Sequence, residues 1–497
     1  MGIRVALTLS ALSLIAAAPP KLDPDTRAWW ATTAELSNDS MEGRDTGSAA
    51  YERAARLVAR KFAAAGLKPA GENGGWFQRV PMHEIALTSV QISVGGRPLR
   101  FLYDLTVGVG PGMPQRVNAE LVYAGYCGTD QLAGVRGKIV ICHGTHREGL
   151  PDAAAREAAV RAAGAVGIMT IADPGFIVEP PRWPFAYARS VTLADDPAQP
   201  DAFLKFTLNA ASLSKVVGPK AIQLIAAGSA GKSLPTFAVS GQFRAQFATR
   251  ERDIASSNVL AMLPGRDPAA ANQAIALTAH LDGYGFGTPV NGDRLYNGTL
   301  DDAAYVALLI RLAERRRAQA YRRPLLFTVV SGEEKGLLGS RWFVKHPTAP
   351  LSGIAADINL DQLRPIFPLE ILTVHALDDS TLGDDVRAVA GGLGIAVRHD
   401  PEPERNLLRR SDNWPFMQAG IPATGFVFGY RPGSRSEQIY RQWYRTGYHK
   451  PQDDLNQPMD WKAAEDFNRF FYALVERVAD QPTAPAWKST SKFRPSR

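Results

Sequence analysis

From about residue 255 onward, short apolar segments alternate with amphipathic ones. Strands are predicted at 258–263, 274–280, 324–331, 354–361, 371–377 and 423–428, and helices at 301–319, 336–345, 382–391 and 461–479. Such alternation favours a largely parallel or mixed sheet covered by helices on both faces. In open sheets of this kind ligands bind beyond the carboxyl ends of the strands, so the residues that follow each strand are the first candidates for a site.

These strand ends carry side chains of the metal-binding types. The candidates are His280, Asp301, Glu333, Glu334, Asp361 and His449. Taken singly, each has an ordinary explanation, because acids at helix starts cap free amides and histidines at strand ends are often structural. Together, two imidazoles and several carboxylates without a nearby basic cluster indicate a divalent metal site. The mixed nitrogen and oxygen donors suit zinc better than calcium.

Six motifs in order strengthen this interpretation. They are AHLDGYG, NGTLDDAAYVALL, SGEEKGLLGS, INLDQL, RSDNWPFMQAGIPA and YHKPQDDL. The set resembles the zinc aminopeptidases of metallopeptidase family 28, which also contains glutamate carboxypeptidases. The segment MEGRDTGSAAYERAARLVARKFAAAGLKPAG is similar to the usual start of that family. The resemblance covers about residues 38–480, interrupted by an insert, and implies a zinc exopeptidase fold with two zinc ions per chain.

The resemblance also implies a role for each candidate. The zinc ligands would be His280, Asp301, Glu334, Asp361 and His449. Asp301 stands at the bridging position, with Asp302 as the neighbour most easily exchanged for it. His280 and either Glu334 or Asp361 would bind separate ions. His449 would complete the ligand shell of one of the two ions, and which one is left open.

Two further residues have catalytic roles under the same resemblance. Asp282 would orient His280 by accepting the hydrogen of its other ring nitrogen. Glu333 would be the general base, which takes a proton from zinc-activated water and returns it to the leaving amine.

Three positions depart from the usual pattern of the family. Gly283 replaces a residue that is often His, Tyr305 stands where Gly is common, and Asn413 stands where His often follows Ser-Asp. None is a predicted ligand, so these departures bear on the shape of the substrate pocket. Tyr305 has the simpler explanation of a helix residue packed against the sheet.

The expected activity is removal of N-terminal residues from peptides, with several alternatives. A carboxypeptidase or dipeptidase needs cations for a carboxylate, and Arg405, Arg409 and Arg410 are candidates. A glutaminyl-cyclase-type acyltransferase on the same fold would use one zinc. A receptor-like homologue without metal predicts gaps in the ligand set, and all five predicted ligands are present.

The expected insert is residues 118–245, with strands at 120–127, 138–143 and 166–171 and a helix at 153–163. The sequences VRGKIVICHG, AAVRAAGAVGIMTIAD and LPTFAVSGQ resemble the β-rich protease-associated domain, which is inserted in several families of secreted peptidases. Within the insert, Cys127 and Cys142 are able to pair in an oxidising compartment, but the sequence does not show whether they lie within bonding range.

These boundaries give a discontinuous peptidase domain, formed by residues 24–117 and 246–485 around the insert. Apolar residues at helical spacing predict that 24 to about 70 is helical. Residues 486–497, rich in Pro, Lys and Ser, are expected to form a loose tail.

The first residues have the pattern of a signal peptide at 1–18. Arg4 precedes an apolar run at 5–17, and small residues at 16–18 fit a cleavage site. That run is too short to span a bilayer, so we expect a periplasmic or secreted protein without stable membrane insertion. The net charge of +7 is dispersed, and its densest stretch, 311–323, ends a predicted helix. Nucleic acid is therefore not an expected partner. The resemblance to the zinc aminopeptidases implies peptide substrates, and the oligomeric state is left open.

Overall fold

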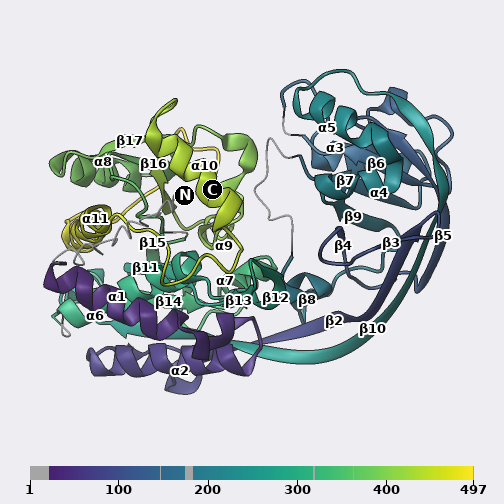
Figure 1. The fold of residues 1–497 in the computed structure, drawn as a ribbon. Helices are drawn as coiled ribbons and strands as arrows, with labels where there is room; N and C mark the ends of the chain where they lie inside the picture. The colour runs from purple at the N-terminus through teal and green to yellow at the C-terminus, as the bar shows by residue number, and fades with distance from the viewer. Residues whose placement is uncertain (1–21, 146, 174–182, 317–318, 362, 496–497) are drawn as a thin grey trace, which may run out of the picture.

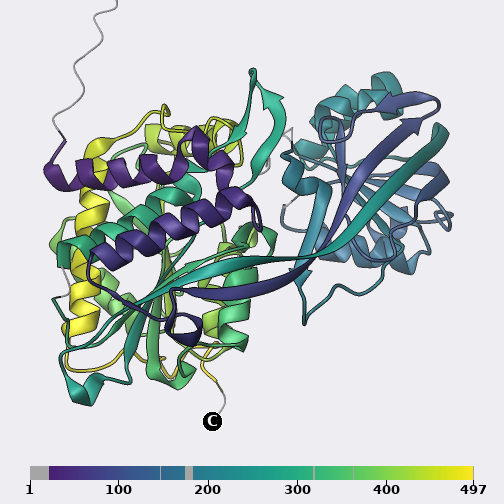
Figure 2. The same cartoon turned by 90° about the horizontal axis from the view of Figure 1, so that it is seen from below.

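The computed structural model describes residues 22–145, 147–173, 183–316, 319–361 and 363–495. The predicted signal peptide lies outside these residues. Two lobes are connected by the long strands β2 (Phe77–Val94) and β10 (Thr236–Leu263), which pair in antiparallel fashion and pass from one lobe to the other (Figures 1 and 2). Within the described part of the chain, no helix is long and apolar enough to cross a membrane.

The first lobe is built on a mixed, mostly parallel sheet, which confirms the predicted α/β class. Its strand order is β17-β16-β18-β15-β11-β14-β10. These strands are β11 (Ala274–His280), β14 (Leu325–Val330), β15 (Ile354–Asn359), β16 (Ile371–His375), β17 (Ala396–Arg398) and β18 (Ala423–Gly429). β11 runs parallel to β14 and β15, and β15 runs parallel to β18. The pairs β10–β14 and β16–β18 are antiparallel, and the short β1 (Lys68–Pro69) also pairs with β10.

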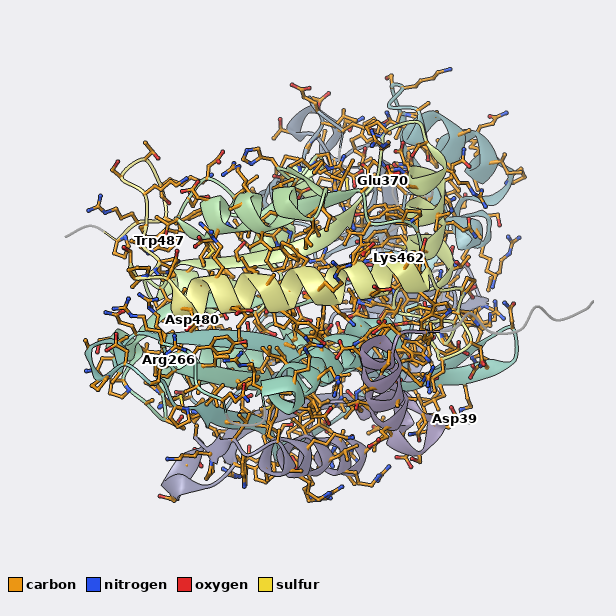
Figure 3. All side chains as sticks on the ribbon, turned by 90° about the vertical axis from the view of Figure 1, so that its left-hand side faces the viewer. Asp39, Arg266, Glu370, Lys462, Asp480 and Trp487 are labelled. Carbon is orange, nitrogen blue, oxygen red and sulfur yellow. A yellow bond between two sulfur atoms is a disulfide. The ribbon has the colours of Figure 1, made fainter. Side chains whose placement is uncertain are left out.

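Helices cover both faces of this sheet, because successive side chains of each strand point to opposite sides. In β11, Ile275, Leu277 and Ala279 join the larger hydrophobic core, while Ala276 joins a smaller one. The larger core is closed by α1 (Pro24–Ser37), α2 (Ala49–Ala64), α6 (Ala304–Arg316), α8 (Leu382–Gly392), α10 (Arg435–Thr446) and α11 (Trp461–Asp480). The smaller core is closed by α7 (Leu338–Lys345) and α9 (Asn413–Gln418). Figure 3 shows α11 lying across this lobe from Lys462 to Asp480.

The second lobe continues the sheet from the other end of β10, in the order β10-β5-β6-β7-β9-β4. Its elements are β4 (Leu105–Val107), β5 (Arg116–Ala124), β6 (Ile139–His143), α3 (Ala153–Ala162), β7 (Gly167–Ile171), β9 (Leu204–Leu208), α4 (Ser214–Val217) and α5 (Ala221–Ser229). Ile92, Val94, Leu99 and Leu105 belong to its core. The second lobe thus begins before residue 118, where we expected the insert to start, because β2 supplies part of its core.

Three elements lie between the lobes (Figure 1). They are β8 (Arg189–Leu193), which pairs with β2, and the hairpin of β12 (Gly285–Val290) and β13 (Asp293–Tyr296). The turn η4 (Phe185–Ala188) precedes β8, and an isolated bridge joins Pro184 to Gly287 of the hairpin. The short β3 (Arg97–Leu99) pairs with the distal end of β2.

Several sequence expectations are corrected. Residues 24–70 form two α-helices with the short 3₁₀ helix η1 (Asp39–Arg44) between them. The extended backbone of Asn38 ends α1, and the positive φ values of Glu42 (48°) and Gly43 (65°) interrupt the helical path within η1. The helix expected from residue 301 begins at Ala304. The expected loose tail is packed as far as Phe493, whose ring lies 5.9 Å from that of Trp414, and Trp487 donates to the carbonyl oxygen of Gly420.

The two cysteines of the second lobe are joined. Cys127 and Cys142 form a disulfide with their Cα atoms 5.5 Å apart, and both are buried. Cys127 lies just beyond β5 and Cys142 is in the neighbouring parallel strand β6. The pairing that the sequence left open is therefore made across two adjacent strands.

Candidate metal centre

Three neighbouring parallel strands end at the same edge of the first lobe. His280, the last residue of β11, pairs in register with Val330 of β14, and Thr278 pairs with Asn359 of β15. The residues that follow these strands therefore meet at one edge. A turn after β14 contains Gly332 with a φ of 74° and leads into η9 (Glu333–Lys335). The predicted juxtaposition of His280, the Glu333–Glu334 pair and Asp361 is thus produced by parallel pairing.

A separate turn, η8 (Thr299–Ala303), brings Asp301 to the same edge. It starts at Gly298, whose φ is 59° and where a Cβ atom would lie 2.5 Å from the carbonyl oxygen of Asp301, so a larger residue does not fit. The backbone N–H groups of Leu300 and Asp301 donate to the carboxylate of Asp453 at 2.9 and 3.1 Å. Asp301 and Asp302 are joined by a cis peptide bond.

Two sets of potential ligands result, and they share one residue. His280, Asp301 and Asp361 form one set, and Asp301, Glu334 and His449 form the other, with the ligand atoms of each set within 4.8 Å of one another. Asp301 Oδ1 lies 3.2 Å from His280 Nε2, whereas its Oδ2 lies 3.4 Å from His449 Nε2. The two oxygens of Asp301 thus face different sets, which is the arrangement a bridging carboxylate requires.

Asp302, which the sequence alone could confuse with the shared ligand Asp301, lies outside both sets. Its Oδ2 accepts a hydrogen bond from the backbone N–H of His280 at 3.2 Å, and its side chain is fully buried. Burial raises the pKa of Asp302 well above its ordinary value. Asp302 therefore fastens the turn to β11, and Asp301 is the residue with both oxygens in the cluster.

The donor atoms of this cluster fit a bound cation. Four of them are buried and have no hydrogen-bond partner within the described part of the chain: His280 Nε2, Asp301 Oδ2, Glu334 Oε1 and Asp361 Oδ1. Leaving buried polar atoms unpaired costs about 1–3 kcal/mol each, so a native protein keeps such a group together for a reason. Two imidazoles and three carboxylates at these distances are the donors that divalent zinc binds.

The electrostatics of the cluster point the same way. Burial and the charges of its neighbours raise the pKa of Glu334 to about 8, and burial also raises the pKa of Asp361. Both shifts mean that the negative charges are unfavourable when no cation is bound, since desolvation and like charges disfavour ionisation. A divalent ion in each set would reverse this cost.

His280 is oriented by the backbone carbonyl oxygen of Asp282, whereas the carboxylate of Asp282 was expected to do this. Its Nδ1 lies 3.1 Å from the carbonyl oxygen of Asp282 and 3.8 Å from the carboxylate. Because a carbonyl oxygen only accepts, Nδ1 carries the hydrogen and the lone pair of Nε2 faces Asp301 and Asp361. The carboxylate of Asp282 instead accepts from the hydroxyl of Thr46 and the backbone N–H of Glu333.

Glu333 lies beside the cluster without belonging to either ligand set. It is half-buried and lines a cavity of about 400 Å³ that also contains Asp301, Glu334 and His449. Burial raises the pKa of Glu333 well above its ordinary value. A carboxylate in this position is able to exchange a proton with a group bound next to the metal sets.

Sequence reasoning missed Tyr284. Its hydroxyl donates to Glu334 Oε2 at 2.5 Å and lies 3.2 Å from His449 Nδ1, and its ring stacks on Tyr187 with centroids 5.7 Å apart. Tyr284 stands inside the AHLDGYG motif, but tyrosine is an ordinary buried residue and nothing in its spacing marks a contact with Glu334. Sequence reasoning also missed Asp453 of the YHKPQDDL motif, because nothing local to that motif indicates its contact with the backbone of Leu300 and Asp301.

The departures from the family pattern have structural explanations. Gly283 packs against the backbone of Gly43, where a Cβ atom would lie 2.9 Å from its carbonyl oxygen. Tyr305 is buried in the larger core with its ring 5.6 Å from Phe467. Asn413 starts α9, with its amide donating to the carbonyl oxygen of Leu408. None of the three belongs to the two ligand sets.

The three arginines that were candidates for binding the terminal carboxylate of a substrate do not all line the cavity. Arg409 and Arg410 line the cavity that contains Glu333. Arg405 is buried and donates to Glu402 and to the hydroxyl of Tyr440, and it is absent from the residues that line this cavity.

The part of the chain that contains this cluster is similar to known peptidases. Residues 258–475 match the family model described as peptidase family M28. Leupeptin-inactivating enzyme 1 from Streptomyces exfoliatus is 27% identical over 235 residues, which cover 46% of this chain and 50% of that protein. The chain thus spans half the length of this curated relative.

Two solved structures share the fold over nearly the whole chain. BSAP, a zinc aminopeptidase from Bacillus subtilis, superposes with a TM-score of 0.62 at 18% identity, covering 93% of this chain and 97% of that one. An aminopeptidase from Aneurinibacillus sp. strain AM-1 gives 0.61 at 19% identity, covering 92% and 95%. The segment that matches the model of peptidase family M28, residues 258–475, contains both ligand sets of the candidate metal centre.

Proposed function

We propose that this protein is a di-zinc aminopeptidase that removes N-terminal residues from peptides. The observation that carries the proposal is the pair of ligand sets that share Asp301, with Glu333 beside them in an open cavity. The match of residues 258–475 to peptidase family M28 and the aminopeptidases among the structural neighbours support it.

In this proposal His280 and Asp361 would hold one zinc ion, Glu334 and His449 would hold the other, and Asp301 would be shared by the two sets. When bound, zinc supplies Lewis-acid chemistry that polarises a carbonyl group and promotes the deprotonation of water. The Nδ1–H of His280 remains on the Asp282 carbonyl oxygen and keeps Nε2 available as a donor. Tyr284 fixes the rotamer of Glu334 through its hydroxyl.

Glu333 is the proposed general base and acid. Its backbone N–H is fixed by Asp282, and its side chain faces the cavity beside the cluster. It takes a proton from the attacking water, holds it on its carboxylate, and returns it to the amine that leaves when the peptide bond breaks. Burial raises the pKa of Glu333, and a raised pKa suits a carboxylate that must first accept a proton and then return it.

A carboxypeptidase or dipeptidase activity is the second candidate, because Arg409 and Arg410 line the same cavity. A guanidinium group binds a terminal carboxylate well, whereas an aminopeptidase needs acceptors for the terminal amine. Substrates blocked at one end separate the two activities: N-acetylated peptides remain substrates for a carboxypeptidase only.

The deciding experiment measures the zinc content of the purified protein by elemental mass spectrometry, together with hydrolysis of Leu-, Ala- and Lys-p-nitroanilide before and after chelation. We expect about two zinc ions per chain and chelator-sensitive release of p-nitroaniline. One zinc ion without amide hydrolysis would favour an acyltransferase, and no metal would favour a binding protein.

We further propose that the protein acts in the periplasm or outside the cell, and that the second lobe is the protease-associated insert expected from its sequence. The Cys127–Cys142 disulfide supports the first point, because such bonds persist in oxidising compartments. Alternating β6, α3 and β7 support the second.

A further inference from the structure

Two cavities meet at the candidate metal centre. The first, described above, contains Glu333 and the metal ligands. The second has a volume of about 450 Å³ and is lined by both lobes. Tyr187, Tyr284 and Glu334 line both cavities. Because the two cavities share these residues, they lie next to each other at the metal centre.

The second lobe forms part of the second cavity. Its walls include residues 106–109, from the end of β4 onward, and Lys205 and Thr207 of β9. β4 is the edge strand of that lobe's sheet. The lining also includes Arg189 of β8 and Lys335 of η9. A peptide leaving the metal centre in this direction would therefore touch the second lobe.

The charges that line this cavity are mainly positive. Arg189 is already paired with Asp45 and Glu84. Among the described residues, the ammonium of Lys335 donates to the carbonyl oxygen of Ala186 at 2.9 Å, and an ammonium group has three donors.

Lys205 is the second cation to consider, and its ion pair with Glu157 is long and partly exposed. Its side chain is 53% exposed and its ammonium lies 3.6 Å from a carboxylate oxygen of Glu157. Among the residues that line the cavity, Glu334 is the acidic one, and we assign it to the metal. The cavity therefore offers Lys205 and Lys335 to an anionic group.

We propose that the second cavity is a distal subsite for the part of a peptide that lies beyond the scissile bond, and that it prefers an acidic side chain there. The proposal rests on the proposed peptidase function, since it places the leaving portion of the substrate between the lobes. Carboxylates of Asp or Glu at the third or fourth residue of the substrate would contact Lys205 and Lys335.

The test compares tetrapeptides with Leu at the N-terminus and Glu, Gln or Lys at the third or fourth position, with release of Leu followed by mass spectrometry. The wild-type protein should show a kcat/KM about fivefold higher for Glu than for Gln, the effect of roughly 1 kcal/mol of ion pairing. Lys205→Glu should abolish this preference and favour the Lys peptide, while Leu-p-nitroanilide hydrolysis stays unchanged. Lys232→Glu, an equal charge change at an exposed position of the same lobe, is the control.

A steric variant tests the path independently of charge. Gly108 is exposed, and a Cβ atom there meets its nearest neighbours at an ordinary contact distance of 3.7 Å, so the backbone accepts a side chain at this position. Gly108→Trp should therefore place bulk in the cavity, with circular dichroism and Leu-p-nitroanilide hydrolysis as checks on the fold. It should lower kcat/KM for tetrapeptides and leave Leu-p-nitroanilide unaffected. If Leu-p-nitroanilide is hydrolysed and both variants treat all tetrapeptides as the wild type does, the subsite is disproved. Absence of any Leu-p-nitroanilide hydrolysis by the metal-loaded wild type would refute the proposed aminopeptidase function itself.

Discussion

The buried guanidinium of Arg44 donates to the carbonyl oxygen of Leu281 at 2.7 Å, between the two site residues His280 and Asp282. The same side chain donates to the carbonyl oxygens of Asn297 and Gly298, which precede the turn of Asp301. One arginine from the N-terminal part of the chain thus connects the two segments that carry the centre.

Replacing this arginine should destabilise the first lobe. Arg44→Ala leaves several buried carbonyl oxygens without a donor, so we expect the free energy of unfolding to fall by about 3 kcal/mol or more in urea denaturation. Arg60→Ala, at an exposed position of α2, should change it by less than about 0.5 kcal/mol. Equal effects of the two substitutions would show that the Arg44 hydrogen bonds contribute nothing.

The shared position of Asp301 predicts unequal metal losses. Asp301→Ala removes a ligand from both sets and should reduce bound zinc from about two ions per chain to nearly none. Asp361→Ala removes a ligand from the His280 set alone and should leave about one ion. Elemental analysis after dialysis measures both, with Asp466→Ala on α11 as a control that keeps full occupancy. Identical stoichiometry in the first two variants would contradict the shared ligand.

Glu333→Gln should separate catalysis from metal binding. The amide cannot act as a general base, so kcat for Leu-p-nitroanilide should fall by about 10²–10⁴-fold. Zinc content should stay unchanged, because Glu333 belongs to neither ligand set. Loss of zinc in this variant would instead make Glu333 a ligand.

Asp104 should make the second lobe sensitive to acid. Burial opposes its ionisation, but hydrogen bonds from Lys215, Arg100 and Ser212 outweigh burial and lower the pKa of Asp104 to about 2. An aspartate in an unfolded chain has a pKa near 3.9, so the stabilisation, about 2 kcal/mol, is complete above about pH 4 and is lost as the pH falls toward 2.

The comparison of wild type with Asp104→Asn measures this contribution. The difference in unfolding free energy between the two proteins should be constant from pH 7 to 5 and shrink between pH 4 and 2.5. A difference that stays constant down to pH 2.5 would mean that the Asp104 carboxylate titrates normally.

The disulfide should stabilise the second lobe. Closing a loop of 15 residues restricts the unfolded chain and is worth about 3 kcal/mol. Reductant should therefore lower the melting temperature of the wild type but not that of the double variant Cys127→Ala/Cys142→Ala. Thiol titration of the unreduced, denatured protein should find no free thiols, and two free thiols per chain would refute the bond.

Much of the centre follows from local sequence alone. Apolar periodicity locates β11, β14 and β15, and parallel pairing places their carboxyl ends at one edge, so His280, Glu334 and Asp361 were predictable as neighbours. The spacing of apolar residues shows which side chains face a core within one strand or helix, and the positions of these three strands follow from that spacing.

Other features depended on contacts between distant segments. Asp301 and Asp302 are adjacent in sequence, and only the η8 turn, fixed by Asp453, decides which one faces both histidines. His449 arrives after the helix α10, and Tyr284 reaches Glu334 across 50 residues. The lobe boundary was also hidden, since β10 is a single strand of 28 residues that serves two cores. Distances of this kind are set by how loops close and cores pack, and local patterns do not encode them.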